Sequence, residues 1–424
     1  MIKVLVFPCG TEVGLEINKS LANSKHFELY GCSSIDDHGA FEYKNYLPNI
    51  PYISEENFIA FLNKLILDYK IDLVIPAHDS AVLKMSKHKA QISAMVICST
   101  FETCEICRSK LLTYNFFENI ILTPKVYGDI NTVKFPVFLK PEVGQGSKGT
   151  HLVGNIYELE FYLKKDPTLL ILEYLPGKEY TIDCFTNYKG ELLFSEGRER
   201  VRTNNGISVN SVSINLEIFR IIALKINTHL NLRGAWFFQL KENINNELVL
   251  LEIAPRIAGT MCLYRNTGVN FIELSLYDFM NYNVRILKNS FKIEIDRALS
   301  NKFKINIFYK TIYIDFDDTI IINNKVNVQI ISFLYQSKNE KKEIILITKH
   351  KNNIYDSLLN YSISYKIFDK IILLGDNDNK SKFIKKDKSI FIDDSFKERY
   401  EVFETLRIPV FSLDSIESLL TSKF

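Results

Sequence analysis

The chain has 424 residues, so two or three domains are expected rather than a single core. Hydrophobic residues make up 46% and charged residues 24%, the balance of an ordinary globular protein. A formal net charge of +2 argues against the concentrated basic face of a nucleic-acid-binding protein, and no apolar run approaches a membrane span.

The cysteines and the first residues of the sequence indicate the cellular compartment in which the protein is expected. Seven cysteines form an odd, scattered set, which fits a reduced compartment better than a disulfide framework. The chain enters an apolar stretch at residues 3–7 without the pattern of a signal peptide. We therefore expect a cytoplasmic protein with small-molecule partners, and neither nucleic acid nor a membrane.

Strand and helix patterns alternate over residues 1–108, which predicts a parallel sheet with helices on its faces. The expected strands are 3–8, 27–32, 73–76 and 95–98, and the expected helices are 14–24 and 56–69. Ligands bind such sheets beyond the carboxyl ends of the strands, where Glu12, His78 and Asp79 fall. We expect these side chains to contact a substrate. Capping of the next helix by Asp79 is an equally good alternative.

A second strand pattern, residues 135–139, ends in Lys140 and enters the glycine loop Gly144–Gly149. The glycines of this loop, Gly146 among them, let backbone N–H groups approach an anion, and Ser147 adds a hydroxyl. Lys140 places a cation at the mouth of the loop. The pattern predicts a polyphosphate site, with a glycine-rich surface hairpin as the alternative on this stretch alone.

The residues that follow favour a nucleotide. An apolar strand ends at Glu173, a short turn contains Leu175, and the next strand carries Glu179. Backbone groups and Glu173 at such a turn can meet an adenine edge, and Glu179 can accept hydrogen bonds from ribose hydroxyls.

Three arginines follow at alternate positions, Arg198, Arg200 and Arg202. On a strand they share one face, and guanidinium groups on one face suit a ligand rich in oxyanions. An exposed, solvated strand face is the competing interpretation.

A hairpin is predicted from residues 236–240 and 247–253, with Gln239 and Glu252 near opposed strand ends. Oxygen ligands from facing strands are what Mg²⁺ takes when phosphates complete its shell. Arg256 lies just beyond and can neutralise charge that develops during phosphoryl transfer.

Together these residues resemble the ATP-grasp superfamily, specifically its carboxylate–amine ligase branch, over about residues 1–300. The resemblance implies an α/β chain with a Rossmann-like pre-ATP-grasp domain at 1–108 and an α+β ATP-grasp domain at 109–300. It also implies ATP and Mg²⁺ as cofactors, and a branch that is often dimeric, which allows a homodimer. The nucleotide residues that it implies are Lys110, Lys140, Gly146, Ser147, Glu173, Leu175 and Glu179.

The same resemblance places Mg²⁺ at Glu252 with Gln239, and Arg256 on the triphosphate. Ala254 departs from the family, which has asparagine two residues after the metal glutamate, so a second Mg²⁺ is expected to be held weakly or differently. The implied reaction passes through an acylphosphate to an amide. Carboxylate and amine substrates are expected against Glu12, His78, Asp79, Arg200 and Arg202.

Carboxylates also end two strand patterns in the last region. Residues 311–314 lead into Asp315, residues 343–347 lead into Thr348, and residues 389–392 lead into Asp393 and Asp394. The ends of parallel strands meet at one edge of a sheet, and several acids there repel unless a divalent cation lies among them.

Residues 308–424 resemble the haloacid dehalogenase superfamily of phosphatases through the motif Asp315-Phe316-Asp317-Asp318-Thr319. The resemblance implies a Rossmann-like domain without a cap, Asp315 as nucleophile and Asp317 as general acid and base. Thr348 would hold the phosphoryl group. Lys380 is preferred to Lys382 as the neutralising cation, with little to separate them. The implied metal residues are Asp315, Asp317, Asp393 and Asp394.

The sequence thus predicts an amide-forming ligase fused to a phosphatase that acts on a related phosphorylated metabolite. Two alternatives remain open at this point. The first is kinase-type transfer to a hydroxyl or phosphate acceptor. The second is a nucleotide-binding module in which one domain is inactive.

Overall fold

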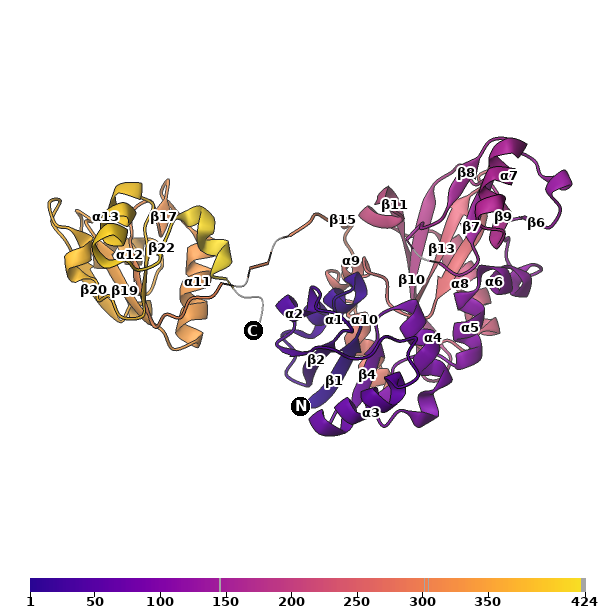
Figure 1. Ribbon diagram of the computed structural model, residues 1–424, viewed down its shortest axis with the longest axis horizontal. Coiled ribbons are helices and arrows are strands. Elements are labelled where there is room, and N and C mark those ends of the chain that lie inside the picture. Colours follow the sequence, from indigo (N-terminus) through magenta and orange to yellow (C-terminus); the bar gives the residue numbers. More distant parts are fainter. Residues whose placement is uncertain (145, 301, 304, 421–424) are drawn as a thin grey trace. The chain divides into compact units, whose positions relative to one another are not determined.

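The computed structural model describes residues 1–144, 146–300, 302–303 and 305–420 (Figure 1). The chain divides into two compact units, Met1–Leu299 and Ser300–Ser422. The first unit contains both of the regions predicted as separate domains, 1–108 and 109–300. That finer division stays a prediction, as does the start of the last domain at 308.

The first unit begins with a parallel sheet in the order β3-β2-β1-β4-β5. Its central strand, β1, is apolar and its last four residues are buried. Thr11 caps the following helix, since its hydroxyl accepts the Gly14 N–H at 3.0 Å. The strands are β1 (Ile2–Phe7), β2 (Phe27–Cys32), β3 (Asn45–Leu47), β4 (Leu73–Pro76) and β5 (Met95–Val96), and the helices are α1 (Glu12–Leu21), α2 (Gly39–Glu42), α3 (Phe58–Tyr69), α4 (Asp79–Lys87), α5 (Phe101–Arg108) and α6 (Lys110–Phe117).

Two antiparallel sheets follow. The smaller has the order β6-β9-β7-β8, and the larger has the order β14-β13-β10-β11-β12-β15. The smaller sheet contains β6 (Val126–Tyr127), β7 (Val137–Pro141), β8 (His151–Val153) and β9 (Leu169–Glu173), with α7 (Ile156–Lys165). The larger contains β10 (Glu179–Thr186), β11 (Leu192–Asn204), β12 (Ile207–Ile214), β13 (Gly234–Glu242), β14 (Leu248–Ala254) and β15 (Glu294–Asp296), with α8 (Glu217–His229), α9 (Cys262–Arg265) and α10 (Phe271–Phe279).

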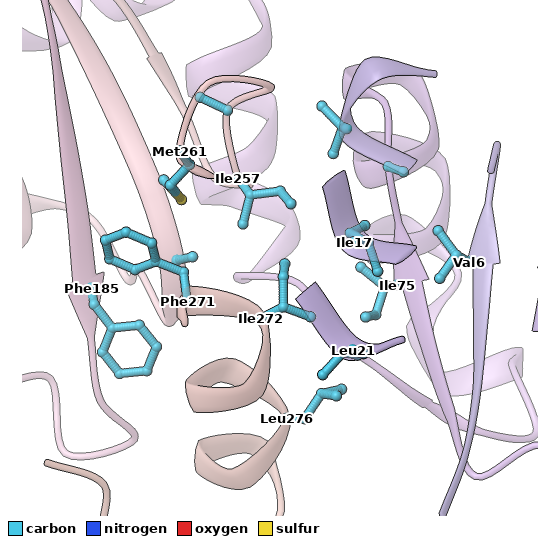
Figure 2. Packing of buried hydrophobic residues seen from close by; sticks show 14 of the residues in the cluster. Val6, Ile17, Leu21, Ile75, Phe185, Ile257, Met261, Phe271, Ile272 and Leu276 are labelled. Carbon is cyan, nitrogen blue, oxygen red and sulfur yellow. The ribbon is translucent and has the colours of Figure 1, made fainter. Parts of the chain in front are cut away.

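One hydrophobic core joins the parallel sheet to the larger antiparallel sheet (Figure 2). Ile17 and Ile75 of the first region lie beside Ile257 and Ile272 of the second. These side chains are at most 6% exposed, so their burial holds the two regions together. Residues of the two regions can therefore form one site.

The second unit contains a parallel sheet in the order β20-β19-β16-β21-β22 and a separate antiparallel pair, β17-β18. In this order β16, β19 and β21 end side by side, as the sequence predicted. The strands are β16 (Thr311–Ile314), β17 (Ile321–Ile322), β18 (Lys325–Val326), β19 (Glu343–Thr348), β20 (Lys370–Leu373), β21 (Ser389–Ile392) and β22 (Val410–Phe411), and the helices are α11 (Val328–Asn339), α12 (Ile354–Asn360) and α13 (Phe396–Leu406). Short 3₁₀ turns occur in both units. Those of the first unit are η1 (Lys89–Gln91) and η2 (Ile130–Thr132), and those of the second are η3 (Tyr365–Ile367), η4 (Lys380–Phe383) and η5 (Leu413–Ser418).

The chain is therefore α/β with parallel sheets in both units. Among the described residues, no helix is both long and apolar enough to cross a membrane.

Candidate active sites

A cavity of about 290 Å³ lies between the two antiparallel sheets of the first unit. The smaller sheet contributes side chains from β7 and β9, and the larger contributes side chains from β10, β11, β13 and β14. The predicted nucleotide and metal residues that line this first cavity are Lys110, Lys140, Gly146, Ser147, Glu173, Leu175, Glu179, Gln239 and Glu252. Residues that are up to 142 positions apart in the sequence thus meet around one space.

Two of the cations that line this first cavity are the predicted lysines Lys110 and Lys140. Lys110 begins α6 and Lys140 lies near the end of β7. Burial, together with the nearby charge of Lys140, lowers the pKa of Lys110 to about 8. Burial likewise lowers the pKa of Lys140. Two partly desolvated ammonium groups in one cavity are stabilised by a bound anion, which would restore both pKa values.

Glu179 lies at the start of β10 and faces two cations. Its carboxylate is 2.8 Å from Arg200 Nη1 and 3.6 Å from Lys241 Nζ. Lys241 was missed in the sequence, although it lies two positions after Gln239 on β13 and strand alternation puts both on one face.

Gln239 and Glu252 are direct cross-strand partners on β13 and β14, beside a register shift. Both line the first cavity, so an amide oxygen and a carboxylate oxygen are available on the same wall. This donor set fits a hard cation such as Mg²⁺, which binds oxygen ligands. Ala254, two residues on, offers no side-chain oxygen.

The glycine loop and the tip of the β11–β12 hairpin touch above this cavity. Gly206 has φ +72°, and a side chain there would clash with Ser147 and with the backbone of Gly146. Arg200 Nη2 donates to the Gly206 carbonyl at 2.6 Å. Among the described residues, the buried Nε of Arg200 has no hydrogen-bond partner. Arg200 therefore holds the hairpin tip.

A second cavity, of about 300 Å³, adjoins the first. Arg200, Gly206, Gln239 and Glu252 line both cavities, so the two spaces share a wall. The predicted substrate residues Glu12, His78, Asp79 and Arg200 line the second cavity, together with Arg198, Arg256 and Arg297.

Asp79 and Arg256 form a two-pronged ion pair at this second cavity, with N–O distances of 2.6 and 2.8 Å. Burial alone would raise the pKa of Asp79, but Arg256 lowers it to about 2. The helix cap expected from Asp79 comes instead from His78, whose Nδ1 accepts the Ser80 N–H. Among the described residues, Arg256 lines the second cavity rather than the first, where the triphosphate contact was expected.

The expected arginine face extends over two residues rather than three. Arg198 is buried against Asp183 and Arg200 reaches Glu179. Arg202 is 61% exposed, binds Asp296 at 2.6 Å and is not among the described residues that line either cavity. The expectation for Arg202 was wrong because the register of β11 shifts between Arg200 and Arg202, which breaks strand alternation.

Arg297 was missed by the sequence analysis. It binds Glu12 at 2.9 Å from a segment far along the chain, and it lines the second cavity. Periodicity gave no signal for it, because its contact depends on how the parallel sheet packs against the larger antiparallel sheet.

In the second unit, Lys380 lies between two aspartates. Its Nζ is 2.6 Å from Asp315 and 2.6 Å from Asp393. Burial raises the pKa of Asp315 to about 7, with Asp393 adding to the rise and Lys380 opposing it. Lys382 is exposed, so the geometry favours Lys380 over Lys382.

Asp315, Asp393 and Asp394 have carboxylate oxygens within 4.8 Å of one another. The oxygen donors of this group also fit a hard divalent cation. Thr348 is fully buried at the end of β19, and Thr319 bonds to Asp394.

Asp317, predicted with this acidic group, has its closest charged partner in His350. Its carboxylate is 2.9 Å from His350 Nδ1. It is not part of the acidic group found among the described residues. His350 was missed, since one histidine two residues after a strand carries no distinctive sequence signal.

Comparison with known proteins bears on the first unit. The family described as ATP-grasp in the biosynthetic pathway with Ter operon matches residues 165–297. D-alanine–D-alanine ligase of Petrotoga mobilis is 33% identical over 93 residues, which are 20% of this chain and 31% of that protein. The chain thus spans less than a third of that relative's length.

Solved structures show the same fold at low identity. N5-carboxyaminoimidazole ribonucleotide synthetase from Thermotoga maritima has a TM-score of 0.56 at 16% identity, over 73% of this chain and 83% of that one. The biotin carboxylase domain of 2-oxoglutarate carboxylase from Hydrogenobacter thermophilus has a TM-score of 0.57 at 13% identity, over 68% of this chain and 71% of that one. The latter was solved with MgADP and bicarbonate.

The first unit is thus similar to ATP-grasp proteins in sequence over residues 165–297, and it shares its fold with the solved structures above. ATP-grasp ligases use ATP and Mg²⁺, and the first cavity has the lysines and oxygen donors that such a pair of ligands requires. The match to the ATP-grasp family ends at residue 297. The second unit is therefore interpreted from its own geometry.

Proposed function

We propose that the first unit is an ATP-dependent ligase that joins a carboxylate to an amine. The observation that carries this proposal is the meeting of Lys110, Lys140, Glu179 and Glu252 around one cavity. The family match and the relatives described above support it.

In this proposal the nucleotide occupies the first cavity. The adenine lies at Glu173 and Leu175, Glu179 accepts the ribose hydroxyls, and the two lysines hold the phosphates. The glycine loop lies over the phosphates with Gly146 and Ser147. Gln239 and Glu252 would hold Mg²⁺, which neutralises phosphate charge when it is bound.

The substrates occupy the second cavity, beside Glu12, Asp79 and Arg200. A carboxylate oxygen attacks the γ-phosphorus, the bond from that phosphorus to ADP breaks, and an acylphosphate forms. The amine nitrogen then attacks the acyl carbon. The bond from that carbon to the phosphate oxygen breaks, inorganic phosphate leaves with the bonding electrons, and the nitrogen loses a proton. The protein's part is to position the reactants and to offset negative charge with Arg200 and Arg256.

ADP release tests this proposal. The purified chain is incubated with ATP, Mg²⁺ and panels of carboxylates and amines, and the products are weighed by mass spectrometry. A ligase product has the mass of both substrates less one water. A product heavier by one phosphate would favour the kinase alternative, and nucleotide binding with no ADP from any pair would favour a binding module.

For the second unit we propose a Mg²⁺-dependent phosphatase with Asp315 as nucleophile. Lys380 between Asp315 and Asp393 supports it, because a cation there offsets the charge of a phosphoryl group beside two acids. Asp393 and Asp394 would hold the metal with Asp315, and Thr348 would hold the phosphoryl group. Asp315→Asn should abolish hydrolysis of an aryl phosphate, and retained hydrolysis would remove Asp315 from this role.

The proposal has three further parts. The phosphatase acts on a phosphorylated metabolite related to the ligase reaction, the protein works in the cytoplasm, and it forms a homodimer. Size-exclusion chromatography with light scattering tests the last part directly.

A further inference from the structure

His350 contacts three polar side chains of the second unit. Its Nδ1 lies 2.9 and 3.0 Å from the two carboxylate oxygens of Asp317, and its Nε2 lies 2.8 Å from the Ser357 hydroxyl on α12. Its backbone N–H donates to the Thr348 hydroxyl at 3.2 Å. One residue therefore touches both the predicted general acid and the predicted phosphoryl-holding threonine.

The imidazole is fixed from several sides. It is only 10% exposed, and the Phe316 ring meets it edge to face with centroids 5.0 Å apart. As the general acid, Asp317 carries its proton on one carboxyl oxygen, and the other oxygen can only accept, so Nδ1 carries the hydrogen that bridges to that second oxygen. Nε2 is then free to accept from the Ser357 hydroxyl.

Among the described residues, His350 is the one side-chain hydrogen-bond partner of the Asp317 carboxylate. Its side chain is 53% exposed and projects from a loop after β16. Fixing an exposed side chain in one rotamer costs conformational entropy. A hydrogen bond to a buried, rigid partner orders the carboxylate before the substrate binds, so this cost does not add to the barrier of the reaction.

We propose that His350 is a positioning residue that aims the Asp317 carboxylate at the leaving group of a phosphate ester. The inference rests on the proposed phosphatase function and deepens it. His350 does not touch the substrate, and it acts only through Asp317.

The reaction step shows where this positioning has an effect. An Asp315 oxygen forms a bond to phosphorus, the bond from phosphorus to the leaving oxygen breaks, and Asp317 gives its proton to that oxygen. Water then attacks the aspartyl phosphate at phosphorus, its proton returns to Asp317, and Asp315 leaves. A poor leaving group needs the proton of the first step, whereas a phenolate of low basicity leaves without it.

The test compares two substrates with the full chain and Mg²⁺. p-Nitrophenyl phosphate has a good leaving group, and a simple alkyl phosphate has a poor one. In His350→Phe, which keeps a ring against Phe316 but has no donor, kcat for the alkyl ester should fall on the order of 10–100-fold. For the aryl ester, kcat should fall less than about 3-fold, with KM unchanged for both esters.

Two further variants keep the test decisive. His350→Asn places an amide nitrogen near the position of Nδ1, so it should recover most of the alkyl-ester activity. Ser357→Ala frees the other side of the ring and should give a smaller loss with the same preference for the aryl ester.

Equal losses on both esters in His350→Phe, or no rescue by His350→Asn, would overturn the positioning role. If His350→Phe does not fold, Ser357→Ala decides the question. The measured quantity is then the loss of kcat on the alkyl ester divided by the loss of kcat on the aryl ester. Absence of hydrolysis of either ester by the wild-type chain would instead refute the proposed phosphatase, and with it this role.

Discussion

Gly206, at the tip of the β11–β12 hairpin, lies directly against Ser147 of the glycine loop. Its φ is +72°, and there is no room for a side chain between the two segments. Because both residues line the first cavity, the hairpin and the loop together form its roof. The contact between these two segments thus depends on a glycine outside the recognisable glycine motif.

Gly206→Ala should weaken nucleotide binding by forcing this roof apart. Gly190→Ala is the matched control, because Gly190 has φ +80° and no atom within 4 Å of an added side chain. Both variants carry a similar backbone strain of about 1 kcal/mol. Calorimetry with a non-hydrolysable ATP analogue should show a loss on the order of 10-fold for Gly206→Ala alone. Equal nucleotide affinities in the two variants would show that the hairpin tip at Gly206 has no part in nucleotide binding.

Nucleotide affinity should fall as pH rises through about 8. The pKa of Lys110 is lowered to about 8 by burial and by Lys140, so this ammonium loses its proton near that pH in the free protein. Bound phosphates favour the charged form, and binding therefore takes up a proton between about pH 7 and 9. Titrations in two buffers of different ionisation enthalpy measure the number of protons taken up.

Lys110→Arg is the control for this effect, because a guanidinium stays protonated throughout that pH range. Its affinity should change less between pH 7 and 9 than the wild-type affinity does. A wild-type affinity that rises with pH would contradict the assignment of Lys110 to the phosphates.

Glu252→Gln should raise the Mg²⁺ concentration needed for half-maximal ADP release, on the order of 10-fold or more, because it removes the charged metal ligand. Gln239→Glu, which adds a carboxylate opposite, should move that concentration the other way. If neither change alters the Mg²⁺ dependence, the metal is held elsewhere.

Asp79→Asn should destabilise the chain by about 2 kcal/mol at pH 7, since a pKa lowered to about 2 from 3.8 corresponds to that free energy. Because the folded pKa lies below the unfolded one, the contribution is fully present above about pH 4 and is lost as pH falls towards 2. Guanidinium unfolding should show the gap between wild type and variant shrinking to about half by pH 3. A constant gap would mean that packing, not charge, sets the loss.

Lys380→Met and Lys382→Met form a matched pair in the second unit. The first should abolish aryl-phosphate hydrolysis, because Asp315 and Asp393 lose the buried cation between them. The second removes an exposed charge and should leave hydrolysis within about 2-fold. Similar activities in both variants would contradict the role of Lys380.

Much of the architecture could be predicted because its signals are local. Apolar runs placed the strands that end at Glu173, Ile314 and Thr348, and the facing positions of Gln239 and Glu252 followed from a hairpin pattern. A lysine before a glycine loop and acids after apolar strands are patterns of neighbouring residues, so they can be recognised in one sequence without knowledge of the tertiary contacts.

The rest depends on geometry that no local pattern encodes. A register shift in β11 turned Arg202 away from Arg200, and the shared core of the first unit brought Arg297 to Glu12. His350 reached Asp317 from a different strand end, and a short 3₁₀ turn decided between Lys380 and Lys382. These contacts arise only once the sheets have packed.

Oxygen transfer tests the central claim most directly. A panel of carboxylates labelled with ¹⁸O in the carboxyl group is incubated with the full chain, ATP, Mg²⁺ and amines, and the released phosphate is analysed by mass spectrometry. An acylphosphate leaves one labelled oxygen in each phosphate, and this is the result that we predict. ADP release with entirely unlabelled phosphate, or no ADP with any carboxylate, would contradict the ligase mechanism.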